Sequence, residues 1–219
     1  MYKVIIICLL APMALDAAQR EEIGPLNERP IRGSVARGSL PSPHLSVVGV
    51  TVGVDELGDV MKRLGQSTVF KIRVAGRPDA VCYYSSDPTD DSVVVFEAGP
   101  MGGWHTLTGA TVCSSRAIPR YRKFCTKSAK VNRQGTATGG GISRGLSRSV
   151  IRRIVGQAPS FVDKVVDEYN WDTAKESSHS TDSGGTEQGD VGRHVLTGFT
   201  AVFSNGRLDW FQVYKVESD

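Results

Sequence analysis

Apolar residues recur along this chain with two different periods, and the change of period predicts its elements. Two segments, 55–65 and 147–156, carry apolar residues every three or four positions, which is the spacing of an amphipathic helix. Their apolar stripes are Leu57, Val60, Met61 and Leu64 in the first segment, and Val150, Ile151, Ile154 and Val155 in the second. Each segment begins with a residue suited to cap a helix, Asp55 or Ser147, and each ends on a glycine. The sequence therefore predicts two short helices.

Strand-like runs rich in apolar residues follow each helix. They cover 80–84, 92–97 and 106–113 in the first half, and 162–169, 195–203 and 208–216 in the second. Asn205-Gly206 lies between the last two runs, and Asn-Gly is the favoured pair for a two-residue hairpin. We therefore expect an α+β fold of two tandem modules, each a short amphipathic helix packed on an antiparallel three- to four-stranded meander.

The two halves of the chain can be aligned in two registers. In one, Leu107-Thr108-Gly109 matches Leu196-Thr197-Gly198, 89 residues later. In the other, Val95-Phe96 matches Val202-Phe203, 107 residues later, and the order of elements is kept if the low-complexity stretch 175–190 is an insertion. We prefer the second register because it preserves that order.

These patterns divide the chain into five parts. The parts are a signal peptide (1–18), a proline-rich disordered or tethering segment (19–43), module 1 (44–120), a basic linker (121–140) and module 2 (141–219) with its insertion.

The first residues resemble a secretory signal. Lys3 precedes the apolar run 4–10, and small residues such as Ala17 and Ala18 follow it. The run is shorter than the ~20 apolar residues that a membrane-spanning helix needs. We expect cleavage near Ala17 or Ala18 and a periplasmic or secreted protein with no transmembrane segment in its mature chain; a retained N-terminal strand is the alternative.

Export makes the cysteines informative, because disulfides persist outside the cytoplasm. Cys82, Cys113 and Cys125 remain after cleavage. Cys113 and Cys125 bracket a short polar segment, so we expect these two to pair. Cys82 with Cys113 is the second choice, and the odd number leaves one thiol over.

Charge is distributed unevenly along the chain. From 98 to 162 there is no Asp or Glu and there are eleven Lys or Arg residues, whereas 163–219 holds eleven acids and five bases. Arg120, Arg122 and Lys123 form the densest basic group. Such asymmetry favours binding to another protein or an anionic envelope component. Alternatively, the basic linker docks on the acidic second module. Nucleic acid is disfavoured by export and by the lack of a recognisable reader motif.

One pattern raises the possibility of catalysis. Gly141-Ile142-Ser143-Arg144-Gly145 matches the G-x-S-x-G nucleophile motif, and Asp163 or Asp167 and then His179 or His194 follow in the order of a serine hydrolase. The motif requires a hydrophobic strand before the serine, yet the preceding residues are polar and Gly-rich. A serine hydrolase using Ser143 is therefore the alternative, and a non-enzymatic protein is the expectation.

No motif predicts a metal site or a cofactor. The chain has four histidines, His44, His105, His179 and His194. None of them lies at the sequence spacing typical of metal ligands from another histidine or from a cysteine. Neither a phosphate-binding loop nor a dinucleotide fingerprint occurs.

The second helix and its surroundings carry a family resemblance. Gly145-Leu146-Ser147, Val150, Ile151, Gly156 and Pro159, followed by a strand ending in Tyr169, resemble the module of the SmpA/OmlA-type (BamE-like) outer-membrane assembly lipoproteins. Two such modules in tandem resemble the β-lactamase inhibitor proteins (BLIP-like). The first module departs from the pattern, since Ser67 stands in place of the proline. The resemblance implies an exported bacterial protein and protein–protein recognition, as an inhibitor or an envelope-assembly accessory.

Aromatic residues are the remaining candidates for a binding surface, because exposed aromatic side chains on a sheet are typical anchors. We expect binding residues among Tyr84, Trp104, Tyr169, Trp171, Trp210 and Tyr214, together with the basic residues Arg120, Arg122 and Lys123. The expected function is that of an exported binding protein. A structural envelope protein that binds anionic surfaces is a further alternative.

Overall fold

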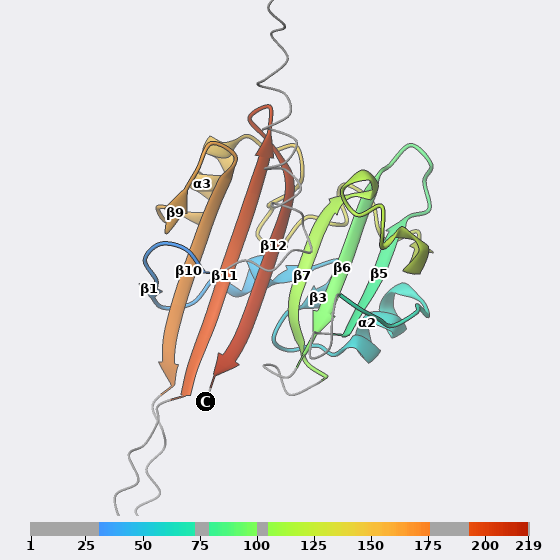
Figure 1. The fold of residues 1–219 in the computed structure, drawn as a ribbon, viewed down its shortest axis with the longest axis horizontal. Coiled ribbons are helices and arrows are strands. Elements are labelled where there is room, and N and C mark those ends of the chain that lie inside the picture. Colours follow the sequence, from blue (N-terminus) through green and yellow to red (C-terminus); the bar gives the residue numbers. More distant parts are fainter. Residues whose placement is uncertain (1–30, 73–78, 100–104, 176–192, 219) are drawn as a thin grey trace, which may run out of the picture.

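Ten strands hydrogen-bond into one mixed sheet in the computed structural model of the protein, which describes residues 31–72, 79–99, 105–175 and 193–218 (Figure 1). The strand order is β1-β10-β11-β12-β7-β6-β5-β4, with β8 paired to β5 and β9 paired to β10 outside this path. The strands are β1 (Ala36–Arg37), β4 (Phe70–Lys71), β5 (Asp79–Ser85), β6 (Ser92–Ala98), β7 (Leu107–Ser114), β8 (Cys125–Ser128), β9 (Phe161–Val162), β10 (Val166–Lys175), β11 (Arg193–Ser204) and β12 (Arg207–Ser218). A separate pair is formed by β2 (Ser46–Val47) and β3 (Val50–Thr51).

The expected α+β fold of two tandem helix-on-meander modules is wrong. The described residues are mostly β-structure, and β12 pairs antiparallel with β7 through Phe211↔Val112 and Tyr214↔Gly109. This pairing joins the first three long strands to the last three in one sheet. Backbone groups on a free strand edge need hydrogen-bond partners, and each set of strands supplies them to the other.

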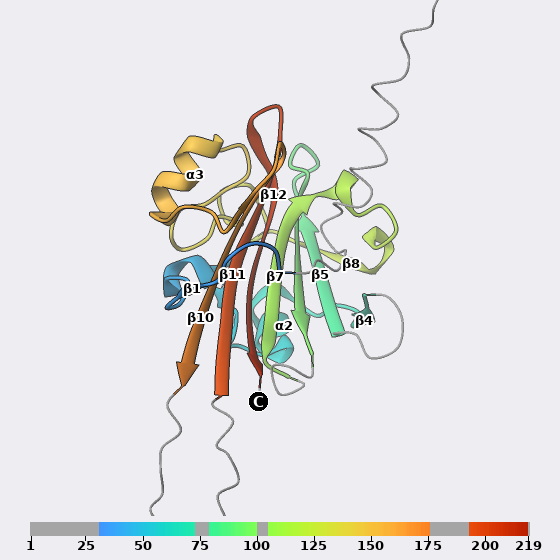
Figure 2. The same ribbon diagram turned by 60° about the vertical axis from the view of Figure 1, so that its left-hand side comes forward.

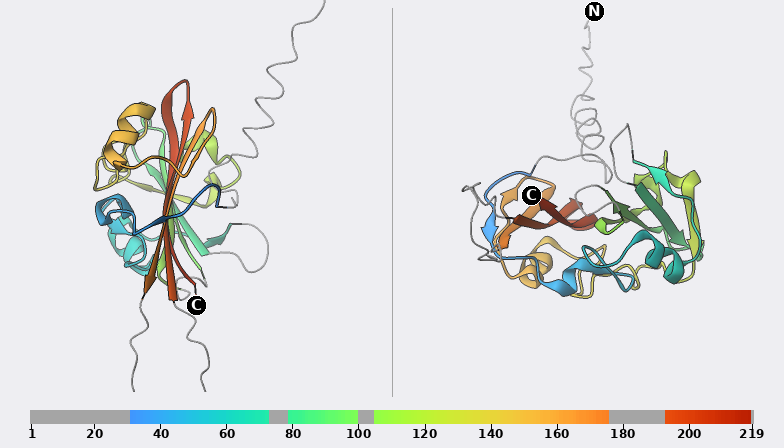
Figure 3. Two further views of the ribbon diagram at one scale, coloured as in Figure 1. Left: turned by 90° about the vertical axis from the view of Figure 1, so that its left-hand side faces the viewer. Right: turned by 90° about the horizontal axis from the view of Figure 1, so that it is seen from below.

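Both predicted helices are present and lie on the same face of the sheet. They are α2 (Leu57–Leu64) and α3 (Arg148–Val155). The short 3₁₀ helix η1 (Ser42–Leu45) lies on the same face (Figure 3, left). Ser147 caps α3, and Gly156 adopts the left-handed conformation after it with φ 71°. The N-cap residue of α2 is Glu56 and not the expected Asp55. The Asp55 carboxylate instead accepts a hydrogen bond from the Thr51 amide at 2.6 Å.

The predicted strands are confirmed except at one place. The Asn-Gly hairpin joins β11 to β12, with positive φ at Asn205 (51°) and Gly206 (71°) as its two-residue turn requires. The run 162–169, expected to be one strand, is split between β9, which folds back, and β10. β6 and β11 are each the middle of three consecutive antiparallel strands, which agrees with the order-preserving alignment.

The main hydrophobic core lies between the sheet and the two helices. Its largest fully buried side chains are Tyr83, Phe96, Tyr169, Phe199 and Phe211. A smaller cluster, which includes Phe70, Cys82 and Trp210, lies on the opposite, helix-free face. This second cluster covers only part of that face and leaves polar residues on the rest.

The proline-rich arm is partly built into the fold. β1 pairs in parallel with β10, and the buried Leu40 donates its amide hydrogen to Thr197 Oγ1 at 2.8 Å. Residues 36–40 therefore belong to the fold, although they lie within the segment 19–43 that was expected to be disordered or tethering. The leader 1–18, the arm 19–30 and nearly all of the insertion 175–190 lie outside the described residues.

Candidate functional site

The segment 115–128, here called the basic segment, connects β7 to the end of β8 and covers part of the helix-free face. It contains two 3₁₀ turns, η3 (Ser115–Ala117) and η4 (Arg122–Phe124), and then β8, which pairs in parallel with β5 (Figure 2). The ring of Phe124 stacks on that of Phe70 of β4, with centroids 5.1 Å apart. Together with the buried Ile118, this stacking fixes the segment against the sheet.

The disulfide joins Cys82 to Cys125, so both expected pairings, Cys113 with Cys125 and Cys82 with Cys113, are wrong. Cys82 and Cys125 lie opposite each other in the β5–β8 pair, with Cα atoms 4.4 Å apart. Cys113 is a free, buried thiol on β7. The expectation rested on sequence proximity, whereas the pairing follows from a parallel β5–β8 contact that no local pattern indicated. The presence of a disulfide was predicted correctly.

The basic segment displays five exposed cations: Arg116, Arg120, Arg122, Lys123 and Lys127. No acidic residue occurs within the segment. None of the five forms an ion pair with any residue in the described parts of the chain. Lys123 lies over the Phe124 ring, 5.0 Å from its centroid. The segment is therefore a fixed concentration of positive charge, and it includes all three predicted basic residues.

The basic linker packs mainly on the first half of the chain rather than on the acidic second half. Lys130 Nζ donates to the Arg63 carbonyl at 2.7 Å, and the Arg133 amide donates to Asp90 Oδ2 at 2.7 Å. Docking of the linker on the second module is therefore not seen among the described residues; the acidic stretch 176–190 lies outside them.

Three of the six predicted aromatic anchors belong to the core. Tyr169, Trp171 and Trp210 are at most 4% exposed. Tyr84 and Tyr214 lie half-buried on the helix-free face, and Trp104 lies outside the described residues. Strand periodicity assigns alternate residues to opposite faces, but here both faces of the central strands bury large side chains. A continuous aromatic binding face is therefore not formed by the described residues.

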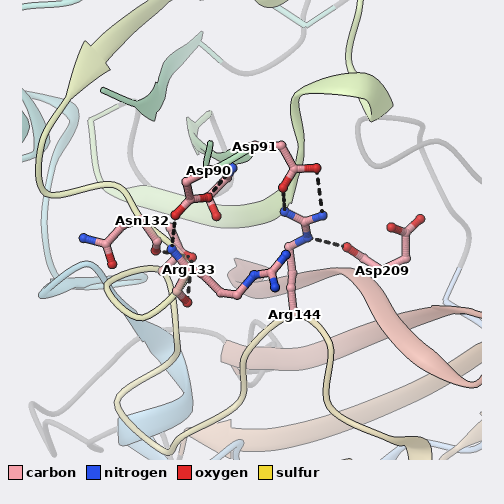
Figure 4. Close-up of polar contacts among 8 residues, drawn as sticks. Asp90, Asp91, Asn132, Arg133, Arg144 and Asp209 are labelled. Carbon is pink, nitrogen blue, oxygen red and sulfur yellow. Dashed lines mark hydrogen bonds and ion pairs between the residues drawn. The ribbon is translucent and has the colours of Figure 1, made fainter. Parts of the chain in front are cut away.

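The G-x-S-x-G motif folds as a structural junction. Arg144 is nearly buried, and its guanidinium binds both carboxylate oxygens of Asp91, with Nη1 2.9 Å from Oδ1, while Nε donates to the Asp209 carbonyl at 2.7 Å (Figure 4). Gly141 and Gly145 both have positive φ, as the tight turns on either side require. Arg144 thus ties the β5–β6 turn to the start of β12.

The residues of a serine hydrolase do not meet around Ser143. Ser143 lies beside the start of β12, because Gly145 donates to the Leu208 carbonyl at 2.8 Å. His194 pairs with Ser218 at the far end of β12, which at about 3.3 Å per residue is on the order of 30 Å away. Asp167 is held by Arg148 and Arg152 instead, and His179 lies outside the described residues.

The helix-free face also carries a polar row that the sequence analysis did not identify. Each member comes from a different strand of the sheet, at aligned positions. The row is Asn170, Gly198, Tyr214, Gly109 and Glu97, and the adjoining row contains Glu168, Thr200, Gln212 and Thr111. No single strand shows this clustering, since it arises only from strand register.

Glu97 is the chemically unusual member of these rows. Burial raises the pKa of its carboxyl to about 7, and the neighbouring Thr111 hydroxyl opposes the rise. Glu97 Oε1 and Thr111 Oγ1 are both buried without a hydrogen-bond partner among the described residues. A carboxyl with this pKa changes charge near neutral pH.

Neither a metal-binding cluster nor a helix able to span a membrane occurs among the described residues. No group of three or more His, Cys, Asp or Glu side chains there could hold a metal ion. None of the helices in the described ranges is long and apolar enough to cross a membrane.

Comparison with known proteins adds no identity. No protein-family model, curated protein or solved structure matches the chain. The resemblance to SmpA/OmlA-type and β-lactamase inhibitor modules therefore remains a prediction from the motif residues alone.

Proposed function

We propose that this chain is an exported, non-enzymatic binding protein that recognises the acidic surface of a partner protein through the basic segment. The observation that carries this proposal is the group of five exposed cations, none of which is neutralised by the described residues. Surface cations are normally interspersed with anions, so an uncompensated group is a recognised footprint of binding to an anionic partner.

The way in which the basic segment is held supports specific recognition. The Cys82–Cys125 disulfide and the Phe70–Phe124 stack fix the backbone that carries the charges. A preorganised surface loses less conformational entropy on binding, which favours a partner of complementary shape. Attraction to an anionic lipid surface needs only flexible charge, so rigidity favours a protein partner over a membrane.

The test compares two triple variants with the same change in net charge. Arg120→Gln/Arg122→Gln/Lys123→Gln neutralises the basic segment, and the control Arg37→Gln/Arg153→Gln/Lys164→Gln neutralises exposed cations elsewhere. Poly-L-glutamate serves as the acidic polypeptide, and anionic phospholipid vesicles serve as the lipid probe.

We expect the basic-segment variant to bind poly-L-glutamate about tenfold more weakly than the unmodified chain, since each exposed charge contact contributes about 0.2–1 kcal/mol. The control variant should lose less than about twofold. Equal losses in the two variants would mean that net charge alone is responsible. Binding to vesicles but not to poly-L-glutamate would show that the basic segment recognises a lipid surface and not a protein.

A further inference from the structure

We propose that Glu97, Thr111 and Gln212, arranged around Gly109 on the helix-free face, bind an organic cation that carries N–H donors, either an ammonium or a guanidinium group. These four residues are called the Gly109 site below. The site shares no residue with the basic segment and does not depend on the proposed function.

Strand register brings the members of the Gly109 site together. Gly109 of β7 lies opposite Glu97 of β6 on one side and Tyr214 of β12 on the other, and Thr111 lies opposite Gln212. A Cβ atom placed on Gly109 would lie 3.8 Å from Gln212 Nε2 and 3.9 Å from Glu97 Cβ. The carboxyl and amide side chains therefore flank a position at which the sheet presents only backbone.

Unused hydrogen-bonding capacity is the main argument for a ligand. Glu97 Oε1 and Thr111 Oγ1 are buried, and neither forms a hydrogen bond of ordinary geometry with another described residue, although the two groups lie close enough for the Thr111 hydroxyl to lower the pKa of Glu97. Leaving a buried polar atom unpaired costs about 1–3 kcal/mol, so folded proteins seldom keep two side by side without a use.

In the other half of the same polar surface, Arg32, Glu168, Asn170 and Tyr214 hydrogen-bond to one another. Arg32 Nε donates to Glu168 Oε1 at 3.1 Å, and Asn170 Nδ2 donates to the Arg32 carbonyl at 3.1 Å. Tyr214 donates its hydroxyl hydrogen to Asn170 Oδ1. Its ring reaches across Gly198, where an added Cβ would lie 2.2 Å from Tyr214 Cζ. Tyr214 is thereby directed away from Glu97. Within the two polar rows of this face, the buried side-chain atoms that lack a partner among the described residues belong to Glu97 and Thr111.

The charges of this face select a cationic ligand. The titratable or charged groups of the strands that face the same side are Tyr84 of β5, Cys113 of β7, Tyr214 of β12, Glu168 and Asp172 of β10 and His194 of β11, together with Arg32. The basic segment, which covers part of this face, adds the exposed cations Arg116, Arg120, Arg122, Lys123 and Lys127, none of which forms an ion pair with Glu97. Arg32, Lys71 and His194 each pair with a carboxylate other than Glu97. The Glu97 carboxylate forms no ion pair with any described residue, and the Thr111 and Gln212 oxygens supply further acceptors for N–H donors.

Binding should depend on pH near neutrality. Because burial raises the pKa of Glu97 to about 7, the carboxyl is largely protonated below that pH and cannot attract a cation. A bound cation stabilises the carboxylate and lowers this pKa. Affinity should therefore fall about tenfold between one pH unit above the pKa and one unit below it.

The experiment is an NMR titration of the folded chain with n-butylammonium and, separately, n-butylguanidinium. The readouts are the amide signal of Gly109, the side-chain amide of Gln212 and the carboxyl carbon signal of Glu97. We expect saturable shifts of all three above pH 7, about tenfold weaker binding below it, and a lowered Glu97 pKa when a probe is bound.

Glu97→Gln removes the charge with little change of shape and should abolish the shifts, whereas Asp87→Asn removes an exposed carboxylate elsewhere and should leave them unchanged. The Arg120/Arg122/Lys123 variant should also leave them unchanged, which separates this site from the proposed function. A lysine-containing peptide that binds more tightly than n-butylammonium would identify a protein side chain as the source of the cation, and equal affinity would identify a small amine. No saturable shift with either probe, or equal shifts in Glu97→Gln, would overturn the proposal.

Discussion

At the scale of single residues, buried charges are the features on which stability depends most. Asp167 is completely buried between α3 and the sheet, where its carboxylate lies 2.9 Å from Arg152 Nε and 3.3 Å from Arg148 Nε. The pairing raises the pKa of the Arg152 guanidinium, the side-chain hydrogen bond being the largest cause. The interaction holds the second helix on β10.

Asp167→Asn should lower the free energy of unfolding by about 3 kcal/mol, because removing one partner of a buried ion pair leaves the other charge uncompensated. Urea denaturation of the variant and of the unmodified chain measures the difference. Asp163→Asn, at an exposed position, should change stability by less than about 0.5 kcal/mol. Equal effects of the two substitutions would show that Asp167 does not stabilise the helix contact.

Glu97 gives stability a pH dependence of unusual sign for a carboxyl. Its pKa in the folded chain is raised from 4.5 to about 7 by burial, so the fold favours the neutral form. The contribution is complete below pH 4.5 and is lost as pH rises to about 7. Glu97→Gln should be less sensitive to pH over this window and more stable than the unmodified chain above it. Urea midpoints at several pH values test this, and parallel curves for the two proteins would contradict it.

Residue-scale features with local causes were predictable from the sequence. Ser147 as a cap, Gly156 after the helix and the Asn205-Gly206 turn each depend on a few neighbouring residues. Glu97 was not predictable as a site, because its partners come from strands that are distant in sequence. A charged residue in an otherwise apolar strand was the available signal.

At the scale of elements, the disulfide and the basic segment depend on each other. The Cys82–Cys125 bond closes a loop of 43 residues that contains β6, β7 and most of the basic segment. Its removal should destabilise the protein by about 2–4 kcal/mol, since the unfolded chain gains conformational freedom.

The thiols provide a direct test at this scale. Burial raises the pKa of the Cys113 thiol to about 12, so it should resist alkylation in the folded protein and react only after unfolding. Peptide mapping of the unreduced protein should recover Cys82 linked to Cys125. Recovery of Cys113 linked to either of them would contradict the β5–β8 pairing.

Element positions were predicted well and element contacts were not. Helical and strand periodicity located α2, α3 and the long strands because each is encoded by its own side chains. The parallel β5–β8 pair and the pairing of β1 with β10 depend on contacts between segments far apart in the sequence. Alternation along a strand shows which residues share a face of the sheet, but it does not show whether one face or both are covered by other elements.

At the scale of the whole molecule, the β12–β7 pair makes one sheet of the two halves. Arg144 supports the same junction by binding Asp91 from the first half and the Asp209 carbonyl from the second. A sheet that is continuous through its centre should unfold as a unit.

Urea unfolding should therefore give coincident transitions when followed by far-ultraviolet circular dichroism and by exposure of Cys113 to a thiol reagent. The fluorescence of Trp171 in a Trp104→Phe/Trp210→Phe variant, which reports on the second half alone, should follow the same curve as that variant's circular dichroism. Separate transitions for the two halves would indicate independent modules and contradict the continuous sheet.

Charge distribution is the whole-molecule property on which the proposed function depends. The uneven distribution was visible in the sequence, but the fold was needed to show that Arg120, Arg122 and Lys123 are exposed on a fixed segment and form no ion pair with the residues that the structure describes. Both halves of the chain contain acidic residues, so the sequence alone did not show whether these three cations are neutralised.

The most direct measurement is the salt dependence of poly-L-glutamate binding by the unmodified chain, the Arg120/Arg122/Lys123 variant and the Arg37/Arg153/Lys164 control. Binding of the unmodified chain and the control should weaken steeply and in parallel as salt increases, because exposed charge contacts are screened over about 10 Å at 0.1 M. The basic-segment variant should bind weakly with a shallower dependence. Identical salt dependences for all three proteins would contradict recognition through the basic segment.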